Sequence, residues 1–165
     1  MKLYYSPAAC SLSPHIVARE AGIPIELVKV DLKAHTLADG TDYTTVNPKG
    51  SVPLLELDDG DRLSEGPAIV QYLADRNPAA GLAPAAGTMA RYRLQEWLNF
   101  ITSELHKQYS PLFDTAVPAE YRDAVRSRLA KRFDWLSTRL AQRDYLTGAQ
   151  FSVADAYLIT VLSWN

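Results

Sequence analysis

Short apolar runs separated by turn residues predict a mixed α/β first half of the chain. Residues 1–5 and residues 26–32 are rich in leucine, valine and tyrosine, which predicts two strands. Between them, residues 14–22 are apolar at helical spacing and end at a glycine, which predicts a helix. Because a helix separates the two strands, we expect them to pair in parallel. The polar residues 33–47 predict a surface connection.

A second pair of short strands and a helix complete this half. Residues 54–57 and 62–64 flank the sequence Asp-Asp-Gly-Asp, and an Asp-Gly turn between apolar runs is a strong signal for an antiparallel hairpin. Residues 64–76 then predict a helix with an apolar side. The first half is therefore predicted to run β-α-β, long loop, β-β-α.

The second half of the chain has helical periodicity. Residues 77–87 are rich in alanine, proline and glycine, and we expect an interdomain connection there. From Thr88 onward, and again in residues 121–143, apolar residues recur at helical spacing. Pro111 and Pro118 predict a loop between these two helices.

A third helix is predicted at the end of the chain. Ser152 and Asp155 have the spacing of a capping box, in which both side chains satisfy backbone N–H groups at a helix start. Residues 154–164 are nearly all apolar, so this helix should be buried. We interpret Asp155 as structural. The fold class is thus α/β followed by an all-α helical domain.

Composition narrows the classes of function. A hydrophobic content of 47% and a charged content of 22% are ordinary for a globular core. A net charge of −2 gives no electrostatic reason to expect nucleic acid or an anionic membrane as a partner. The single cysteine excludes an internal disulfide and an all-cysteine metal site, and we expect no metal. With no leader peptide or spanning segment evident, the cytoplasm is the expected location.

That single cysteine, Cys10, lies between the first predicted strand and the first predicted helix. Ser11 and Ser13 are good N-cap residues, and Pro14 suits a first helical position. Since a helix start carries partial positive charge, we expect a lowered pKa for the Cys10 thiol and some thiolate near neutral pH. The simpler interpretation is a small buried hydrophobic side chain.

This stretch resembles the start of a bacterial beta-class, or cysteine-type, glutathione S-transferase. The matching residues form the pattern Pro-x-x-Cys-Ser-Leu-Ser-x-His, preceded by an aromatic pair. The resemblance extends over the whole chain. It implies a thioredoxin-like glutathione-binding domain at residues 1–77, a linker at 78–87 and a helical domain at 88–165. Family members continue into further helices, so the resemblance also implies that this sequence is truncated at its C-terminal end.

The resemblance implies a function and a set of site residues. The enzyme would conjugate the glutathione thiolate, as co-substrate, to a hydrophobic electrophile, transferring an alkyl or aryl group. Cys10 and His106, the latter in the sequence Glu-Leu-His-Lys, would be catalytic. Cys10 would also form a mixed disulfide with glutathione and so support thiol–disulfide exchange. Family members are homodimers. The implied glutathione-binding residues are Tyr5, Ser11, His35, Ser51, Val52, Pro53, Glu65, Gly66 and Asn99.

Several of these residues have specific implied roles. Pro53 would follow a cis peptide bond, and the Val52 backbone would pair with glutathione. Glu65 would bind the γ-glutamyl ammonium group, with Gly66 offering only its N–H. His35 stands where lysine is common, which predicts a weaker affinity for glutathione that improves as the pH falls. Ser51 stands where glutamine or asparagine is common, which removes one side-chain contact.

Each of these residues also has a simpler explanation. Glu65 could be an acid that stabilises a helix start. His106 belongs to a polar stripe that is ordinarily a solvated helix face; its other members are Tyr92, Asn99, Ser103 and Ser110. Three functions therefore remain as alternatives: a glutaredoxin-like or dehydroascorbate-reductase-like redox enzyme, a non-catalytic binding protein of the same fold, and a protein that stores hydrophobic ligands.

Overall fold

The computed structural model describes residues 1–164, and its first half is built on a five-stranded sheet. Strand β1 (Lys2–Tyr5) leads through helix α1 (Leu12–Glu20) to strand β2 (Glu26–Asp31). The two strands are parallel, with Lys2 opposite Glu26, as the crossover helix predicted.

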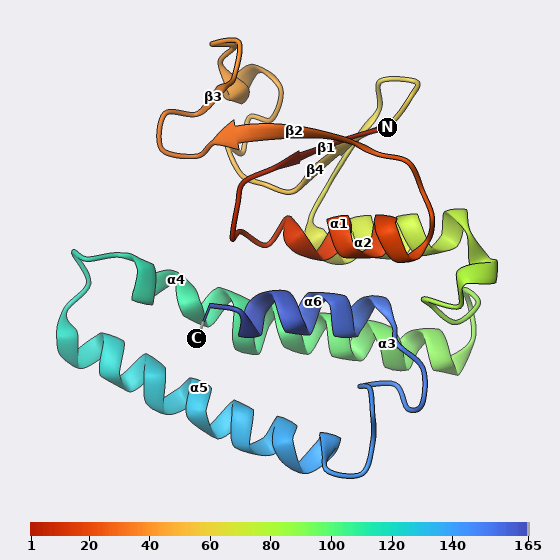
Figure 1. Ribbon diagram of the computed structural model, residues 1–165. Coiled ribbons are helices and arrows are strands. Elements are labelled where there is room, and N and C mark those ends of the chain that lie inside the picture. Colours follow the sequence, from red (N-terminus) through yellow and green to blue (C-terminus); the bar gives the residue numbers. More distant parts are fainter. Residues whose placement is uncertain (165) are drawn as a thin grey trace.

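The predicted hairpin forms the other side of the sheet. Strands β4 (Leu54–Glu56) and β5 (Arg62–Ser64) pair in antiparallel fashion, and β4 also pairs with β1. Helix α2 (Gly66–Arg76) follows and packs beside α1. Figure 1 shows both helices on one face of the sheet, between the sheet and the remaining helices. The strand order is β3-β2-β1-β4-β5. This is the thioredoxin-like domain that the resemblance implied.

The connection between β2 and β4 is more ordered than its polar sequence predicted. It contains the short strand β3 (Thr36–Leu37), which pairs with β2, and a 3₁₀ turn, η1 (Tyr43–Thr45). Tyr43 is completely buried and its hydroxyl donates to the Ser51 carbonyl at 2.9 Å. The prediction of a surface connection is confirmed for most of this segment, whose residues are largely exposed, but not at Tyr43, because this aromatic side chain anchors the segment to the sheet.

The second half is helical, as its periodicity predicted. Thr88 caps the first long helix by accepting a hydrogen bond from the Arg91 backbone N–H. Pro111 lies inside a helix rather than in a loop, because buried Tyr109 and half-buried Leu112 continue the helical packing around it. The elements are η2 (Pro78–Ala80), α3 (Met89–Phe100), the π-helical turn η3 (Ile101–His106), α4 (Lys107–Phe113), α5 (Ala119–Leu140) and α6 (Val153–Leu162).

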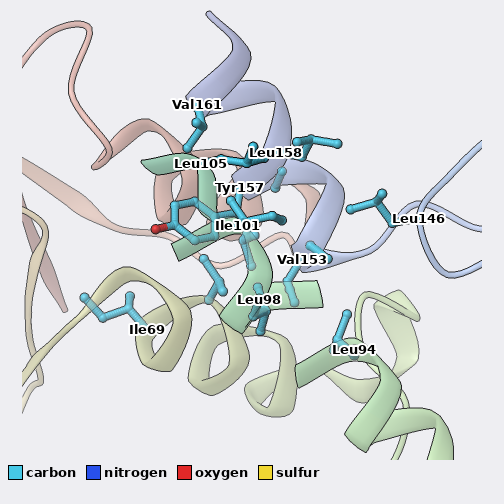
Figure 2. Packing of buried hydrophobic residues seen from close by; sticks show 14 of the residues in the cluster. Ile69, Leu94, Leu98, Ile101, Leu105, Leu146, Val153, Tyr157, Leu158 and Val161 are labelled. Carbon is cyan, nitrogen blue, oxygen red and sulfur yellow. The ribbon is translucent and has the colours of Figure 1, made fainter. Parts of the chain in front are cut away.

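The two halves share one hydrophobic core, which α6 joins to both. This helix packs against α1 and α2 of the first half and against α3 and η3 of the second. Figure 2 shows its side chains among those of α2, α3 and η3. Within residues 1–164, no helix combines the length and the apolar character needed to cross a bilayer. The labelled core residues are Ile69, Leu94, Leu98, Ile101, Leu105, Leu146, Val153, Tyr157, Leu158 and Val161.

The start of α6 is held by the predicted capping box. One Asp155 carboxylate oxygen accepts from the Ser152 N–H at 2.9 Å and from the Ser152 hydroxyl at 2.6 Å. The other oxygen accepts from the Leu146 N–H at 2.8 Å. Asp155 therefore fixes both the buried helix and the loop that precedes it.

We expect the substitution Asp155→Ala to lower the free energy of unfolding by about 2 kcal/mol, because it removes a helix cap and leaves backbone N–H groups unpaired. Urea denaturation measures this change. Asp134→Ala is the matched control, because Asp134 is exposed on α5. Equal midpoints for the two variants would contradict the assignment of Asp155 as a structural anchor.

Candidate active site

Cys10 lies in the loop between β1 and α1, as predicted, but the helix start is built differently. α1 begins at Leu12, earlier than expected, and neither Ser11 nor Ser13 caps it with a side chain. The Ser11 hydroxyl instead donates to the Ser6 carbonyl at 3.2 Å, and the Ser13 hydroxyl donates to the Cys10 carbonyl at 3.0 Å. The two serines therefore brace the loop that carries the thiol.

The electrostatics of Cys10 correct the prediction of a reactive thiolate. Its own backbone N–H and that of Ser11 lower the thiol pKa, which is the expected effect of a helix start. Burial of the side chain outweighs them, and the nearby charge of Glu65 acts in the same direction as burial. Together they raise the pKa of Cys10 to about 11. The thiol is therefore protonated at neutral pH and donates to the Val52 carbonyl at 3.1 Å.

The segment before β4 places backbone groups next to the thiol. The Val52–Pro53 peptide bond is cis, as the resemblance implied, and both residues are buried. The Ser51 side chain is exposed, while its carbonyl accepts from the Tyr43 hydroxyl and from the Asn47 side-chain amide at 2.7 Å. Tyr43 and Asn47 thus hold the Ser51 carbonyl, and the Cys10 thiol holds the Val52 carbonyl.

Glu65 stands at the start of α2 in an unusual backbone conformation. Its φ is +71°, a left-handed value that non-glycine residues rarely adopt and that is often found at ligand sites. Its exposed carboxylate pairs with the Lys49 ammonium at 2.8 Å, and that ammonium also donates to the Ser64 hydroxyl at 3.0 Å. Gly66 is the first residue of α2. The Glu65 carboxylate and the Gly66 backbone N–H therefore lie together at one helix start.

His106 is the last residue of the π-helical turn η3. The Lys107 N–H bonds to the Thr102 carbonyl, five residues back. The Thr102 and Ser103 hydroxyls donate hydrogen bonds to the carbonyls of Leu98 and Asn99, respectively. Such side-chain bonds compete with the regular backbone hydrogen bonds of a helix. His106 is half-buried, whereas Ser103 and Asn99 of the predicted polar stripe are exposed. The wide turn therefore separates His106 from the solvated face, and such turns are frequent at functional sites.

Two aromatic residues of α6 and the following turn complete the surroundings of His106, and the sequence interpretation did not select them. The Tyr157 hydroxyl lies 2.5 Å from His106 Nδ1, and Figure 2 shows this hydroxyl pointing away from the apolar cluster. The Trp164 ring packs edge-on against His106 with centroids 4.9 Å apart, and its indole N–H donates to the Ala8 carbonyl at 2.8 Å. The sequence did contain one sign of Tyr157, because its hydroxyl is a polar group in a predicted helix that is otherwise nearly all apolar.

The protonation states of this pair follow from burial. Burial lowers the pKa of His106, and the adjacent Lys107 ammonium lowers it further, so the imidazole is neutral near pH 7. Burial raises the pKa of Tyr157 to about 12, so its hydroxyl keeps its proton. With Tyr157 as the donor to His106 Nδ1, the neutral imidazole carries its proton on Nε2.

Side chains from the two halves of the chain influence one another's pKa values. The charge of Glu65 acts on the pKa values of Cys10, His106 and Tyr157, and Cys10 acts on that of Tyr157. The α1 loop, the α2 start, η3 and α6 thus bring these four residues into one site at the junction of the two halves. Within residues 1–164, no cluster of three or more His, Cys, Asp or Glu side chains could hold a metal ion.

The other predicted residues lie around this group or outside it. Tyr5 is the half-buried last residue of β1. His35 is exposed, has a φ of +54°, and packs so closely on Gly50 that a Cβ atom there would lie 2.9 Å from the imidazole. Asn99 is exposed on α3, and its carbonyl accepts from Ser103. Glutathione contacts for all three stay predictions.

Known proteins share both the sequence and this arrangement. Residues 8–76 match the glutathione S-transferase N-terminal domain, and residues 119–164 match the C-terminal domain. Glutathione S-transferase GstA of Escherichia coli O157:H7 is 49% identical over 164 residues, which cover 99% of this chain and 82% of that protein. The chain belongs to the glutathione S-transferase family.

Solved structures place it among the bacterial beta-class members. The ternary complex of BphK, a bacterial glutathione S-transferase, is 58% identical with a TM-score of 0.97, and a sphingomonad glutathione S-transferase complexed with glutathione is 50% identical with a TM-score of 0.96. The beta-class glutathione S-transferase of Sphingomonas chungbukensis is 46% identical with a TM-score of 0.95. The matches cover 99% of this chain and 82% of each of those chains. The chain thus spans about four fifths of the length of these beta-class relatives.

Proposed function

We propose that this glutathione S-transferase conjugates the glutathione thiolate to hydrophobic electrophilic small molecules. The observation that carries the proposal is the convergence of Cys10, Glu65 and His106, which come from three separate elements, beside the Val52 backbone. A scaffold without catalysis would need none of these groups together. The glutathione-bound sphingomonad relative supports the same co-substrate.

Glutathione would lie along the ends of β4 and α2. Its amino group would replace the Lys49 ammonium on Glu65, and its γ-glutamyl carboxylate would accept from the Gly66 N–H. Its peptide backbone would pair with the backbone of Val52. An anion at a helix start is favoured by the free N–H groups and the helix dipole. These contacts would hold the glutathione sulfur close to Cys10.

The protonated state of Cys10 suits a role as a hydrogen-bond donor. Its S–H and the N–H groups at the start of α1 would stabilise the glutathione thiolate over the thiol, which supplies the nucleophile at neutral pH. The thiolate then forms a bond to an electrophilic carbon while a halide leaves with its electron pair, or while an activated alkene takes up a proton. His106, through its Nε2–H, would hydrogen bond to the sulfur or transfer that proton.

Thiol–disulfide exchange would be a slower second activity. The Cys10 thiolate would attack oxidised glutathione, so that a Cys10–glutathione disulfide forms and one glutathione thiolate leaves. Because the Cys10 pKa is raised to about 11, little thiolate is present at neutral pH. The small thiolate fraction of Cys10 therefore favours conjugation over the glutaredoxin-like or dehydroascorbate-reductase-like alternative.

Two assays on the wild type and the Cys10→Ser variant test the proposal. We expect conjugation of glutathione to chlorodinitrobenzene by the wild type, with partial retention in Cys10→Ser, whose hydroxyl can still donate a hydrogen bond. Intact mass after incubation with oxidised glutathione should show one reducible adduct, absent from the variant. Glutathione binding with no turnover of any electrophile would favour the binding or storage alternatives instead.

The presence of His35 in place of the common lysine gives a prediction about glutathione affinity. We expect the KM for glutathione to be lower in His35→Lys than in the wild type, because the lysine ammonium carries a full positive charge that would attract the glycine carboxylate. Steady-state kinetics at a fixed pH measure the difference. An equal KM in the two proteins would remove His35 from the glutathione site.

A homodimer, which the resemblance implied, and a cytoplasmic location complete the proposed description. Sedimentation of the purified protein over a range of concentrations tests the first of these.

A further inference from the structure

Lys49 lies against the Glu65 carboxylate, at the place where the proposed function puts the γ-glutamyl group. Its ammonium donates to Glu65 Oε1 at 2.8 Å and to the Ser64 hydroxyl at 3.0 Å. In the described chain, the Glu65 side chain does not cap α2, although Glu65 stands at the N-cap position. The acid is therefore engaged with a lysine rather than with its own helix.

The backbone of Lys49 is held in a tight turn, whereas its side chain is open to solvent. The Lys49 N–H donates to the side-chain oxygen of buried Asn47 at 3.2 Å, and the Gly50 N–H donates to the Asn47 carbonyl at 2.8 Å. The Lys49 side chain is 56% exposed. Because lysine has a long and flexible stem, the ammonium can change its partner while the backbone stays in place.

The γ-glutamyl end of glutathione carries an ammonium and a carboxylate on the same carbon atom. If this ammonium alone replaced Lys49 on Glu65, the lysine would lose its anion and the substrate carboxylate would gain no cation. An exchange of partners avoids both losses. The substrate ammonium pairs with Glu65 while the displaced Lys49 pairs with the substrate carboxylate, so that each charge has an opposite charge as its neighbour.

We propose that Lys49 is a further substrate-binding residue, which exchanges Glu65 for the γ-glutamyl carboxylate when glutathione binds. The inference rests on the proposed function, because it requires the γ-glutamyl group to lie at Glu65. One carboxylate oxygen accepts from the Gly66 N–H and the other from the Lys49 ammonium. The site is thereby specific for a thiol with both charges, since an ammonium without a carboxylate competes with Lys49 for Glu65 and gives the lysine no new partner.

Titration calorimetry with two ligands tests the exchange. S-methylglutathione carries both charges, whereas S-methylated 4-aminobutyryl-cysteinylglycine keeps the ammonium and lacks the γ-glutamyl carboxylate. We expect the wild type to bind S-methylglutathione about tenfold more tightly than this analogue, because two hydrogen bonds to the carboxylate are lost. In Lys49→Met this ratio should fall about fivefold, the upper end for an ion pair that is open to solvent.

The analogue itself should change in the opposite direction. It should bind about twofold more tightly to Lys49→Met than to the wild type, because its ammonium no longer competes with a lysine for Glu65. A loss of local structure would instead weaken the binding of both ligands. Lys131→Met is the matched control, because Lys131 is exposed on α5 and its loss changes the net charge equally.

Three results overturn the inference. An equal ratio of the two dissociation constants in Lys49→Met and the wild type excludes a contact between Lys49 and the carboxylate, and leaves the proposed function in place. Weakening of both ligands by the same factor in Lys49→Met assigns a structural role to Lys49. Failure of S-methylglutathione to bind the wild type overturns the proposed function and this inference together.

Discussion

Alkylation of Cys10 by iodoacetamide should accelerate about a thousandfold between pH 7 and pH 10, because the thiolate is the reactive species and its pKa is raised to about 11. Below its pKa, a thiol gains about a factor of ten in thiolate for each pH unit. The expected rate therefore rises without a plateau across this range. Intact mass at timed intervals measures the reaction, and the single cysteine makes the adduct unambiguous.

Cys10→Ser provides the background rate of alkylation at other side chains, and free glutathione provides a thiol with no protein around it. A plateau near pH 8 or below would mean that the N–H groups of Cys10 and Ser11 outweigh burial. In that case the thiol would be a thiolate at neutral pH, and thiol–disulfide exchange would move ahead of conjugation as the main activity.

Replacing His106 with alanine should lower kcat for conjugation about a hundredfold, the lower end of the range for a positioned acid–base group. Tyr157→Phe should have a smaller effect, about tenfold, because it removes the hydrogen bond that fixes the histidine tautomer but leaves the imidazole in place. Steady-state kinetics with chlorodinitrobenzene separate kcat from KM in both variants.

The pH profile distinguishes a positioning role of Tyr157 from a merely structural one. A hydroxyl that donates to Nδ1 stabilises the neutral imidazole, so its loss should raise the pKa of His106. The acid limb of the kcat profile should therefore move to higher pH in Tyr157→Phe. Tyr121→Phe is the control, because Tyr121 is half exposed on α5. An unchanged profile in Tyr157→Phe would show that the hydroxyl has no part in setting the state of His106.

The sequence by itself determined the order of the main strands and helices and the location of Cys10, but not β3, η1 or the helix around Pro111. Strands, hairpin and capped helices were predictable because their signals are local: alternating apolar residues, the Asp-Gly turn at Asp59 and Gly60, and the box of Ser152 and Asp155. The resemblance also identified His106 and Glu65 before any geometry was known. The strands, the hairpin and the capping box depend on residues that are neighbours in the chain, and the sequence shows these directly.

The tertiary structure alone decided the chemical states of the site. The helix-start donors to Cys10 exist as expected, but the burial that raises the pKa of its thiol comes from distant segments, including the one that carries Val52. The hydrogen bond from Tyr157 to His106 joins two helices 51 residues apart. Ionisation depends on desolvation and on charges gathered from the whole fold, so it could not be predicted from any one stretch of sequence.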